Sequence, residues 1–84
     1  MTAMTVQLTI KLYGTLDKWV PAYNPETGCV VHMAAQSTVA DLIVHLGVPF
    51  RSVGIVSVNG RAAKKTDVLP DRALIKVFHP VFGG

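Results

Sequence analysis

The sequence predicts an α+β fold in which two strands, one helix and three further strands follow one another along 84 residues. Three observations lead to this prediction. Apolar and polar residues alternate from Val6 to Tyr13, which is the pattern of a strand with one buried face. Apolar residues then recur at helical spacing between Val39 and Leu46. Finally, Asn59-Gly60 is the strongest short signal for a β-hairpin.

The first strand leads into a long connection. From Gly14 to Thr27 the chain carries Pro21, Asn24-Pro25 and other turn formers, which argue against a continuous element. Loops of this length often have a function, so Trp19 and Tyr23 within it are expected either to cap the core or to contact a partner. The β-branched run Cys29–Met33 then predicts a second strand, which should pair with the first as a hairpin.

The predicted helix has recognisable ends. Ser37 or Thr38 can cap its first turn, and Asp41 can reach back to the free backbone N–H groups in a variant of the capping box. The apolar positions i, i+3, i+4 and i+7 form one stripe, namely Val39, Leu42, Ile43 and Leu46. Gly47 and Pro49 should end the helix, which therefore lies on a sheet by its apolar stripe.

Three short strands are expected in the second half. Ile55–Val58 precedes the Asn59-Gly60 turn, and Arg61–Ala63 can return as its partner. A solvated corner at residues 64–67 and a turn at Pro70-Asp71 then lead to the final strand, Leu74–Phe78.

Size and composition limit the function. The length suits one small domain with a single core, too small for a core plus an enclosed active site, so an autonomous enzyme is not expected. Only 15% of the residues are charged, compared with about 25% in typical domains, and the resulting exposed apolar surface favours a docking role. The net charge of +3 comes from scattered residues, which predicts weak attraction to an acidic partner and no nucleic-acid interface.

Other classes of site have little support. Cys29 is the one cysteine and is expected to be a small core residue, consistent with a reducing cytoplasm. The three histidines, His32, His45 and His79, lack metal-ligand spacing to other residues, so no metal is expected. No secretory segment or run of about 20 apolar residues is present, so we expect a cytoplasmic protein without membrane contact.

The chain ends in Gly83-Gly84, after His79-Pro80-Val81-Phe82. Two glycines make the thinnest backbone, so residues 79–84 are expected to form an extended, flexible tail that can enter a partner's active site. From Pro80 onward this tail spans at most about 17 Å. A frayed terminus is the simpler alternative, but fraying does not account for the aromatic Phe82.

Three segments resemble the MoaD/ThiS family of sulfur carriers, which includes the small subunit of molybdopterin synthase. They are Val58-Asn59-Gly60-Arg61, Asp67-Val68-Leu69 and Val77-Phe78-His79-Pro80-Val81-Phe82-Gly83-Gly84. The resemblance covers essentially the whole chain and implies one ubiquitin-like β-grasp domain over residues 1–84, with a mixed sheet and one main helix packed across it. The long loop from Gly14 to Gly28 is more similar to the molybdopterin branch than to the thiamine carrier.

The resemblance also implies a chemistry. Gly84 would be adenylated by a ubiquitin-activating-like enzyme that uses ATP, and then converted to a thiocarboxylate. The large subunit of a synthase would accept this sulfur for a cofactor of the molybdopterin or tungstopterin type. Gly83 and Gly84 would form the reactive terminus, and Phe78, His79, Pro80, Val81 and Phe82 would dock the partners. The carrier itself would bind no cofactor.

Two other functions remain open. In a covalent protein modifier, the same adenylate would pass to a lysine instead of to sulfur, and both functions need a diglycine end. An RNA- or nucleotide-associated β-grasp module would not need a free Gly83-Gly84 terminus, and the sequence lacks a clear aromatic and basic stripe for such binding.

Overall fold

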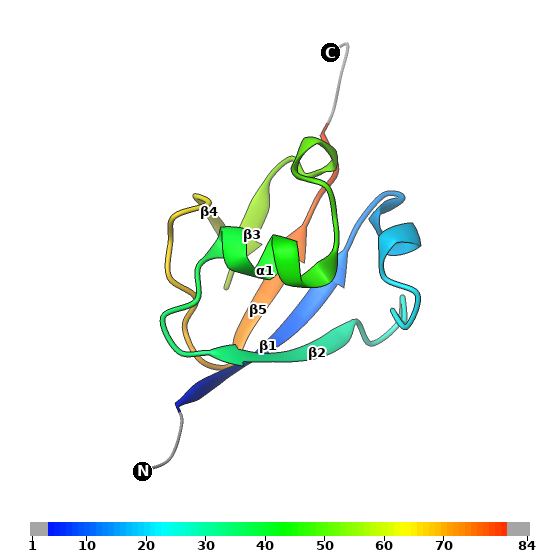
Figure 1. Ribbon diagram of the computed structural model, residues 1–84. Helices are drawn as coiled ribbons and strands as arrows, with labels where there is room; N and C mark the ends of the chain where they lie inside the picture. The colour runs from blue at the N-terminus through cyan, green and yellow to red at the C-terminus, as the bar shows by residue number, and fades with distance from the viewer. Residues whose placement is uncertain (1–3, 81–84) are drawn as a thin grey trace.

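A computed structural model describes residues 4–80 (Figure 1). Its elements are a five-stranded sheet, one α-helix and two short 3-10 turns. The strands are β1 (Thr5–Leu12), β2 (Cys29–Ala34), β3 (Val56–Val58), β4 (Arg61–Ala63) and β5 (Ala73–Val77). The helix is α1 (Val39–Leu46), and the turns are η1 (Leu16–Trp19) and η2 (Phe50–Ser52). The predicted α+β class and element order are confirmed.

The sheet is mixed, with strand order β2-β1-β5-β3-β4. Its two central strands, β1 and β5, are parallel, in a register that runs from Leu8 opposite Ala73 to Leu12 opposite Val77. All other neighbours are antiparallel, including the predicted hairpin of β1 and β2. Because β1 and β5 are parallel, the chain enters at one end of the sheet and leaves from the opposite end (Figure 1).

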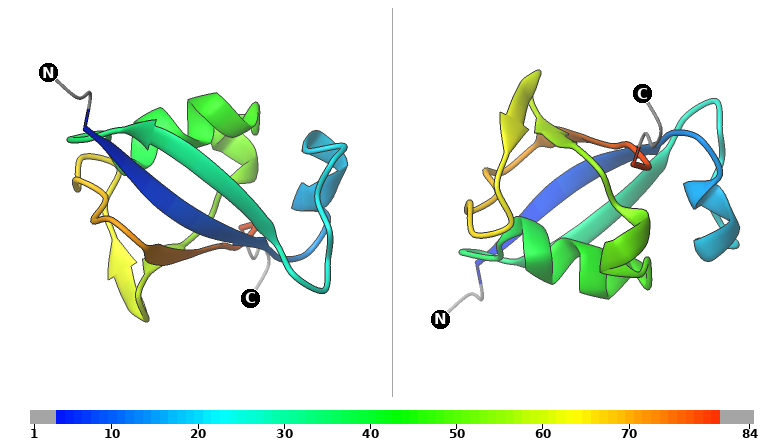
Figure 2. Two further views of the ribbon diagram at one scale, coloured as in Figure 1. Left: turned by 90° about the horizontal axis from the view of Figure 1, so that it is seen from below. Right: turned by 90° about the horizontal axis from the view of Figure 1, so that it is seen from above.

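The core lies between α1 and one face of the sheet. The four apolar residues predicted to face the sheet are all buried, with Leu42 fully inaccessible. They meet the buried alternate residues of the two central strands: Leu8, Ile10, Ile75 and Val77. Figure 2 shows the helix on one side of the sheet, with no described element covering the other. The uncovered side is called the open face below.

The ends of α1 follow the sequence. Thr38 is the cap: its Oγ1 accepts from the Asp41 N–H at 3.2 Å, while Asp41 Oδ2 accepts from the Thr38 N–H at 2.9 Å. This reciprocal pair confirms the predicted capping box and selects Thr38 over Ser37, whose hydroxyl instead donates to the Ala34 carbonyl. Gly47 terminates the helix in the left-handed region at φ 78°.

The long loop is more ordered than the sequence indicates. It contains η1, a turn that the sequence does not predict. The buried side chain of Leu16 anchors this turn on the core. Tyr23 caps the core edge through its hydroxyl, which accepts from the Leu12 N–H at 2.8 Å. Trp19 remains 37% exposed. The turn η2 was also missed, since no apolar period extends over three residues.

The hairpin and last strand agree with expectation to within one residue. Asn59 and Gly60 both have positive φ, 50° and 85°, as the predicted turn requires. The strands begin at Val56 and Ala73 instead of Ile55 and Leu74. In the part of the chain described, no helix is long and apolar enough to cross a membrane.

Candidate functional site

The base of the C-terminal tail is held by backbone hydrogen bonds. After β5, the Phe78 N–H donates to the Ile55 carbonyl at 2.9 Å, and the Phe78 carbonyl accepts from the Gly54 N–H at 2.6 Å. On the other side, the Tyr13 N–H donates to the Val77 carbonyl at 3.0 Å. The sheet therefore fixes the chain up to Phe78, with six residues still to follow.

Two glycines lie against the next two residues, His79 and Pro80. A Cβ on Gly54 would come within 2.9 Å of the His79 carbonyl oxygen and 3.0 Å of the Pro80 Cα. A Cβ on Gly14 would overlap the His79 imidazole, and Gly14 also has a positive φ of 72°. The His79 Nδ1 lies 2.8 Å from the Pro80 carbonyl oxygen. Close backbone approach at Gly54 and Gly14 thus defines the path along which the tail leaves the domain.

Only part of the predicted site falls within the described residues. Phe78, His79 and Pro80 lie at the tail base, whereas Val81, Phe82, Gly83 and Gly84 lie outside residues 4–80. The reactive terminus and its docking residues therefore stay a prediction.

An aromatic pair continues the open face toward the tail. Tyr13 and Phe78 stack with ring centroids 4.7 Å apart and planes 12° apart. The side chain of Ile55, whose carbonyl pairs with Phe78, is 63% exposed beside them. Stacked rings and an exposed aliphatic side chain form an apolar patch directly next to the tail base, which is the surface expected to meet a partner.

Two lysines lie in the row next to this patch, and their sequence positions alone do not indicate that they are neighbours. Lys11 in β1 and Lys76 in β5 are register partners, and Ser57 in β3 follows in the same row. Leu74, one row further along β5, is 37% exposed. The two lysines are more than 60 positions apart in sequence, and so are the two aromatic residues, so only the parallel pairing of β1 and β5 reveals this cluster.

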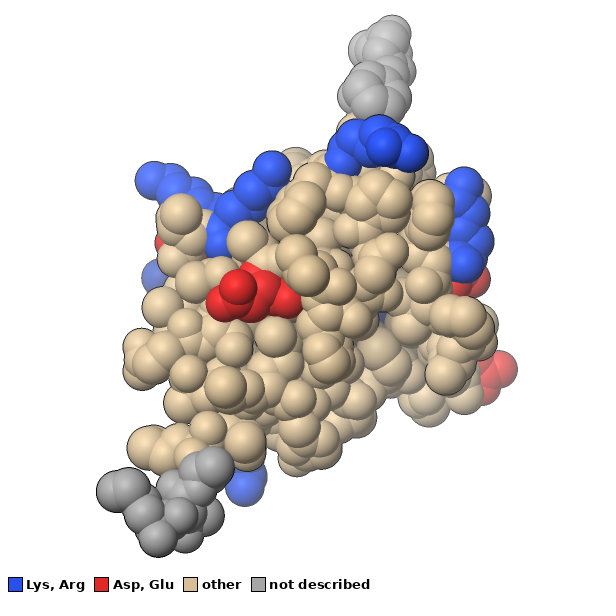
Figure 3. Space-filling model, viewed as in Figure 1, with Lys and Arg blue, Asp and Glu red and all other residues tan. Residues whose placement is uncertain are grey.

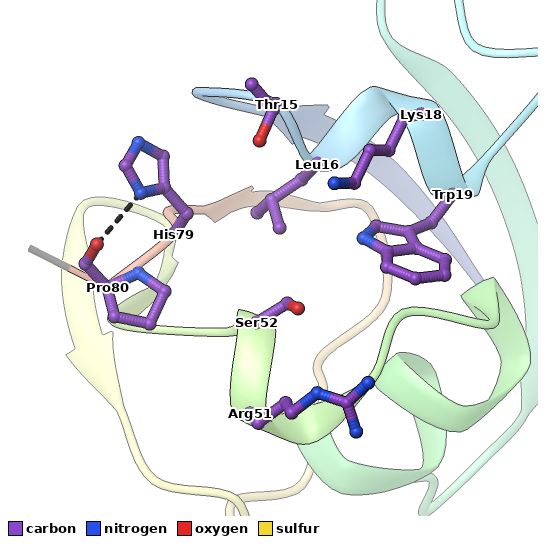
Figure 4. Close-up of a pocket in the computed structure, with 8 residues that line it drawn as sticks. All are labelled: Thr15, Leu16, Lys18, Trp19, Arg51, Ser52, His79 and Pro80. Carbon is purple, nitrogen blue, oxygen red and sulfur yellow. Dashed lines mark hydrogen bonds between the residues drawn. The ribbon is translucent and has the colours of Figure 1, made fainter.

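A pocket of about 480 Å³ lies on the other side of the tail base. We call it the tail-side pocket, and its lining comprises Thr15, Leu16, Lys18, Trp19, Arg51, Ser52, His79 and Pro80. Figure 4 shows residues of η1 facing residues of η2 across this space, with His79 and Pro80 closing one side. No local sequence pattern indicates this pocket, because three distant segments of the chain form it.

Cys29, His32 and His45 do not contribute to these surfaces, whereas His79 lines the tail-side pocket. Cys29 is partly buried against the core, and desolvation raises the pKa of its thiol above the usual 9.0. Cys29 therefore packs at the edge of the core, whereas the sequence predicted a residue inside it. Within residues 4–80, no three His, Cys, Asp or Glu side chains gather closely enough to hold a metal ion.

A helix packed across a mixed sheet, with the last strand central and leading to the tail, defines a ubiquitin-like β-grasp protein. The chain belongs to the Mut7-C ubiquitin family, whose model matches residues 5–83. A search of curated proteins gave no match.

Solved structures agree on the fold. Small archaeal modifier protein 1 of Haloferax volcanii superimposes with a TM-score of 0.70 at 19% identity, covering 90% of this chain and 99% of its own. A candidate molybdopterin converting factor, subunit 1, from Pyrococcus furiosus gives 0.71 at 20% identity, with coverages of 90% and 99%. Another Haloferax volcanii protein gives 0.74 at 23% identity, with coverages of 95% and 88%. The predicted β-grasp fold and the likeness to the MoaD-type fold are thereby confirmed.

Proposed function

We propose that this protein is a sulfur carrier whose C-terminal Gly84 is adenylated and then converted to a thiocarboxylate. The observation that supports this most is the position of β5. This strand lies in the centre of the sheet, with β1 on one side and β3 on the other. The chain that follows it is hydrogen bonded to the domain as far as Phe78, and Gly14 and Gly54 lie against His79 and Pro80. Only four residues then separate Pro80 from the terminal carboxylate.

The proposed chemistry has two steps. A carboxylate is a poor electrophile, so the activating partner would transfer AMP from ATP to Gly84 with release of pyrophosphate. A sulfur nucleophile would then displace AMP and leave the thiocarboxylate. The domain's own side chains take no part in either step; they hold the tail base and dock the partner. Glycine at positions 83 and 84 leaves the narrowest backbone for entry into that partner's active site.

The partners would dock on the apolar patch of Tyr13, Ile55 and Phe78. This patch adjoins the tail base, so one partner can cover the patch and receive the tail at the same time. A ubiquitin-activating-like enzyme and a sulfur-accepting synthase subunit would use it in turn. The cofactor that receives the sulfur would be of the molybdopterin or tungstopterin type, in keeping with the similarity to the Pyrococcus protein. These steps would take place in the cytoplasm.

A covalent protein modifier is the second candidate. The similarity to small archaeal modifier protein 1 favours it, since that protein is named for modification. The two functions share adenylation of Gly84 and differ in the acceptor, which is sulfur in one and a lysine amine in the other.

Intact-mass measurement of the protein purified from its native host separates the two. A carrier is expected to show a species in which one oxygen has been replaced by sulfur, and the mass should revert on hydrolysis. A modifier should instead appear joined to larger proteins through an isopeptide bond. If neither species is found and RNA or nucleotide is bound at the face that carries Lys11 and Lys76, the carrier and the modifier functions are both wrong. The protein would then be a nucleic-acid-associated module.

A further inference from the structure

The tail-side pocket carries positive charge from two separate turns. Lys18 belongs to η1 and Arg51 to η2, and the two residues are far apart in sequence. None of the five acidic residues of the chain lines this pocket. Three of those acids already accept backbone N–H groups elsewhere: Asp41 from Thr38, Asp67 from Lys64 and Asp71 from Gln7. The charge of the pocket is therefore not compensated by its own lining.

The backbones of both turns are anchored, whereas the side chains of Lys18 and Arg51 are themselves exposed. Buried Leu16 fixes η1 on the core, and the ammonium group of Lys18 lies 5.4 Å from the centroid of the Trp19 ring. The turn η2 is closed by backbone hydrogen bonds from Ser52 to Pro49 and from Val53 to Phe50. The backbone of the site is thus formed in advance, and binding has to order only the two long cationic side chains.

The lining selects the chemistry of the occupant. The guanidinium of Arg51 is a planar fork that suits a carboxylate, and Lys18 adds a second positive charge. The hydroxyl groups of Thr15 and Ser52 are further donors, while Leu16 and the Trp19 indole form an apolar wall. An Asp or Glu side chain matches both parts, since its methylene groups meet the wall and its carboxylate meets the cations.

The position of the pocket indicates where this carboxylate comes from. His79 and Pro80 form one wall, so a protein that receives the tail would come close to the opening. Figure 3 shows basic side chains around the edges of the helix side, with acidic groups left of its centre and beside the basic group at the right edge, so the positive charge is not spread evenly over this surface. We propose that the tail-side pocket binds an acidic side chain of the activating enzyme that takes the tail, an inference that rests on the proposed function.

The first test uses that enzyme, prepared from the native host, in an ATP–pyrophosphate exchange assay. The double variant Lys18→Glu/Arg51→Glu should raise the KM for the carrier by about tenfold or more, with kcat little changed, because like charges now meet across the interface. The matched control, Arg61→Glu/Lys64→Glu, makes the same charge change at exposed residues outside the pocket and should change KM by less than about twofold. An equal rise in both variants, or none in the first, would overturn the pocket proposal.

The second test measures the pocket by itself. Trp19 is the sole tryptophan, so its fluorescence reports directly on the lining. Titration with acetylated, amidated tetraglutamate should change its emission, and Arg51→Gln should weaken the apparent affinity by about tenfold, whereas tetraglutamine should have no effect. Inorganic phosphate binding in place of tetraglutamate would assign the pocket to a free anion and overturn the proposal.

The two tests distinguish failure of the proposed function from failure of the pocket proposal. If the wild-type protein gives no pyrophosphate exchange, the proposed function is wrong, and the tetraglutamate titration still decides whether the pocket binds carboxylates. If exchange occurs but is insensitive to Lys18 and Arg51, adenylation stands and the acidic contact is wrong.

Discussion

Tyr13 and Phe78 stack almost parallel, with ring centroids 4.7 Å apart, at the ends of the two central parallel strands. The pair joins a residue near the start of the chain to the last residue held by the sheet. It thereby ties the orientation of the tail base to β1 as well as to β5.

This stack should contribute measurable coupling to stability. In a double-mutant cycle with Tyr13→Ala and Phe78→Ala, we expect an interaction free energy of about 0.5–1.5 kcal/mol beyond the two separate losses. Urea unfolding of the four proteins measures it. A coupling near zero would show that the rings are independent and do not fix the tail base.

The helix face provides a test of the core. Leu42 is fully buried, so Leu42→Ala should lower the free energy of unfolding by about 2–5 kcal/mol. Val44 lies on the same helix but is 66% exposed, and Val44→Ala should therefore cost far less. A loss below about 0.5 kcal/mol for Leu42→Ala in a denaturant titration would contradict the packing of α1.

The sequence predicted α1 and β1 well because one physical signal dominates each of them. The apolar stripe of α1 and the alternation along β1 are local patterns, and each places the apolar residues of its element on one face, which packs into the same core. The Thr38 and Asp41 capping box is likewise local, since its two bonds span three residues.

The surfaces around the tail could not be predicted in the same way. Lys11 and Lys76 become neighbours only through the parallel register of β1 and β5, and Lys18 and Arg51 meet only because η1 and η2 both reach the tail base. Neither short turn has an apolar period long enough to recognise. Contacts of this kind depend on tertiary packing, and no local sequence pattern encodes them.

Gly54 gives a prediction about the direction of the tail. In Gly54→Ala the new Cβ would press on His79 and Pro80, so we expect the tail base to shift and stability to fall by about 1–3 kcal/mol. The NMR signals of the His79 ring report the shift. Gly60→Ala is the control: it has a positive φ but open space around it, so it should lose about 1–2 kcal/mol without moving those signals. Unchanged His79 signals in Gly54→Ala would refute this role.

The terminus should be intolerant of any change in length or width. Deletion of Gly84, addition of one residue after it, and Gly83→Val are each expected to abolish pyrophosphate exchange while circular dichroism stays unchanged. Valine is excluded because its β-branched side chain widens the strand and restricts the backbone. An N-terminal tag should be tolerated, since β1 begins at the end of the sheet remote from the tail. Full exchange by the extended protein would rule out chemistry at the free carboxylate.

Cys29 predicts a pH dependence. Burial raises the pKa of its thiol in the folded state above 9.0, so the folded protein holds this proton to higher pH than the unfolded chain does. The free energy of unfolding should consequently fall as the pH rises from about 9 through the folded-state pKa. Urea titrations of wild type and Cys29→Ala at neutral pH and at pH about 10 test this, with a smaller pH effect expected in the variant. Identical pH dependence would show that Cys29 contributes nothing.

The central position of β5 has a mechanical consequence. Under the proposed function, an enzyme that draws the tail into its active site would pull β5 along its own axis. Because β5 is hydrogen bonded to β1 on one side and β3 on the other, the load is carried as shear by two rows of bonds at once. A strand at the sheet edge, pulled in the same direction, would share the load over a single row of bonds. The domain can therefore withstand a pull on its C-terminal segment without unfolding.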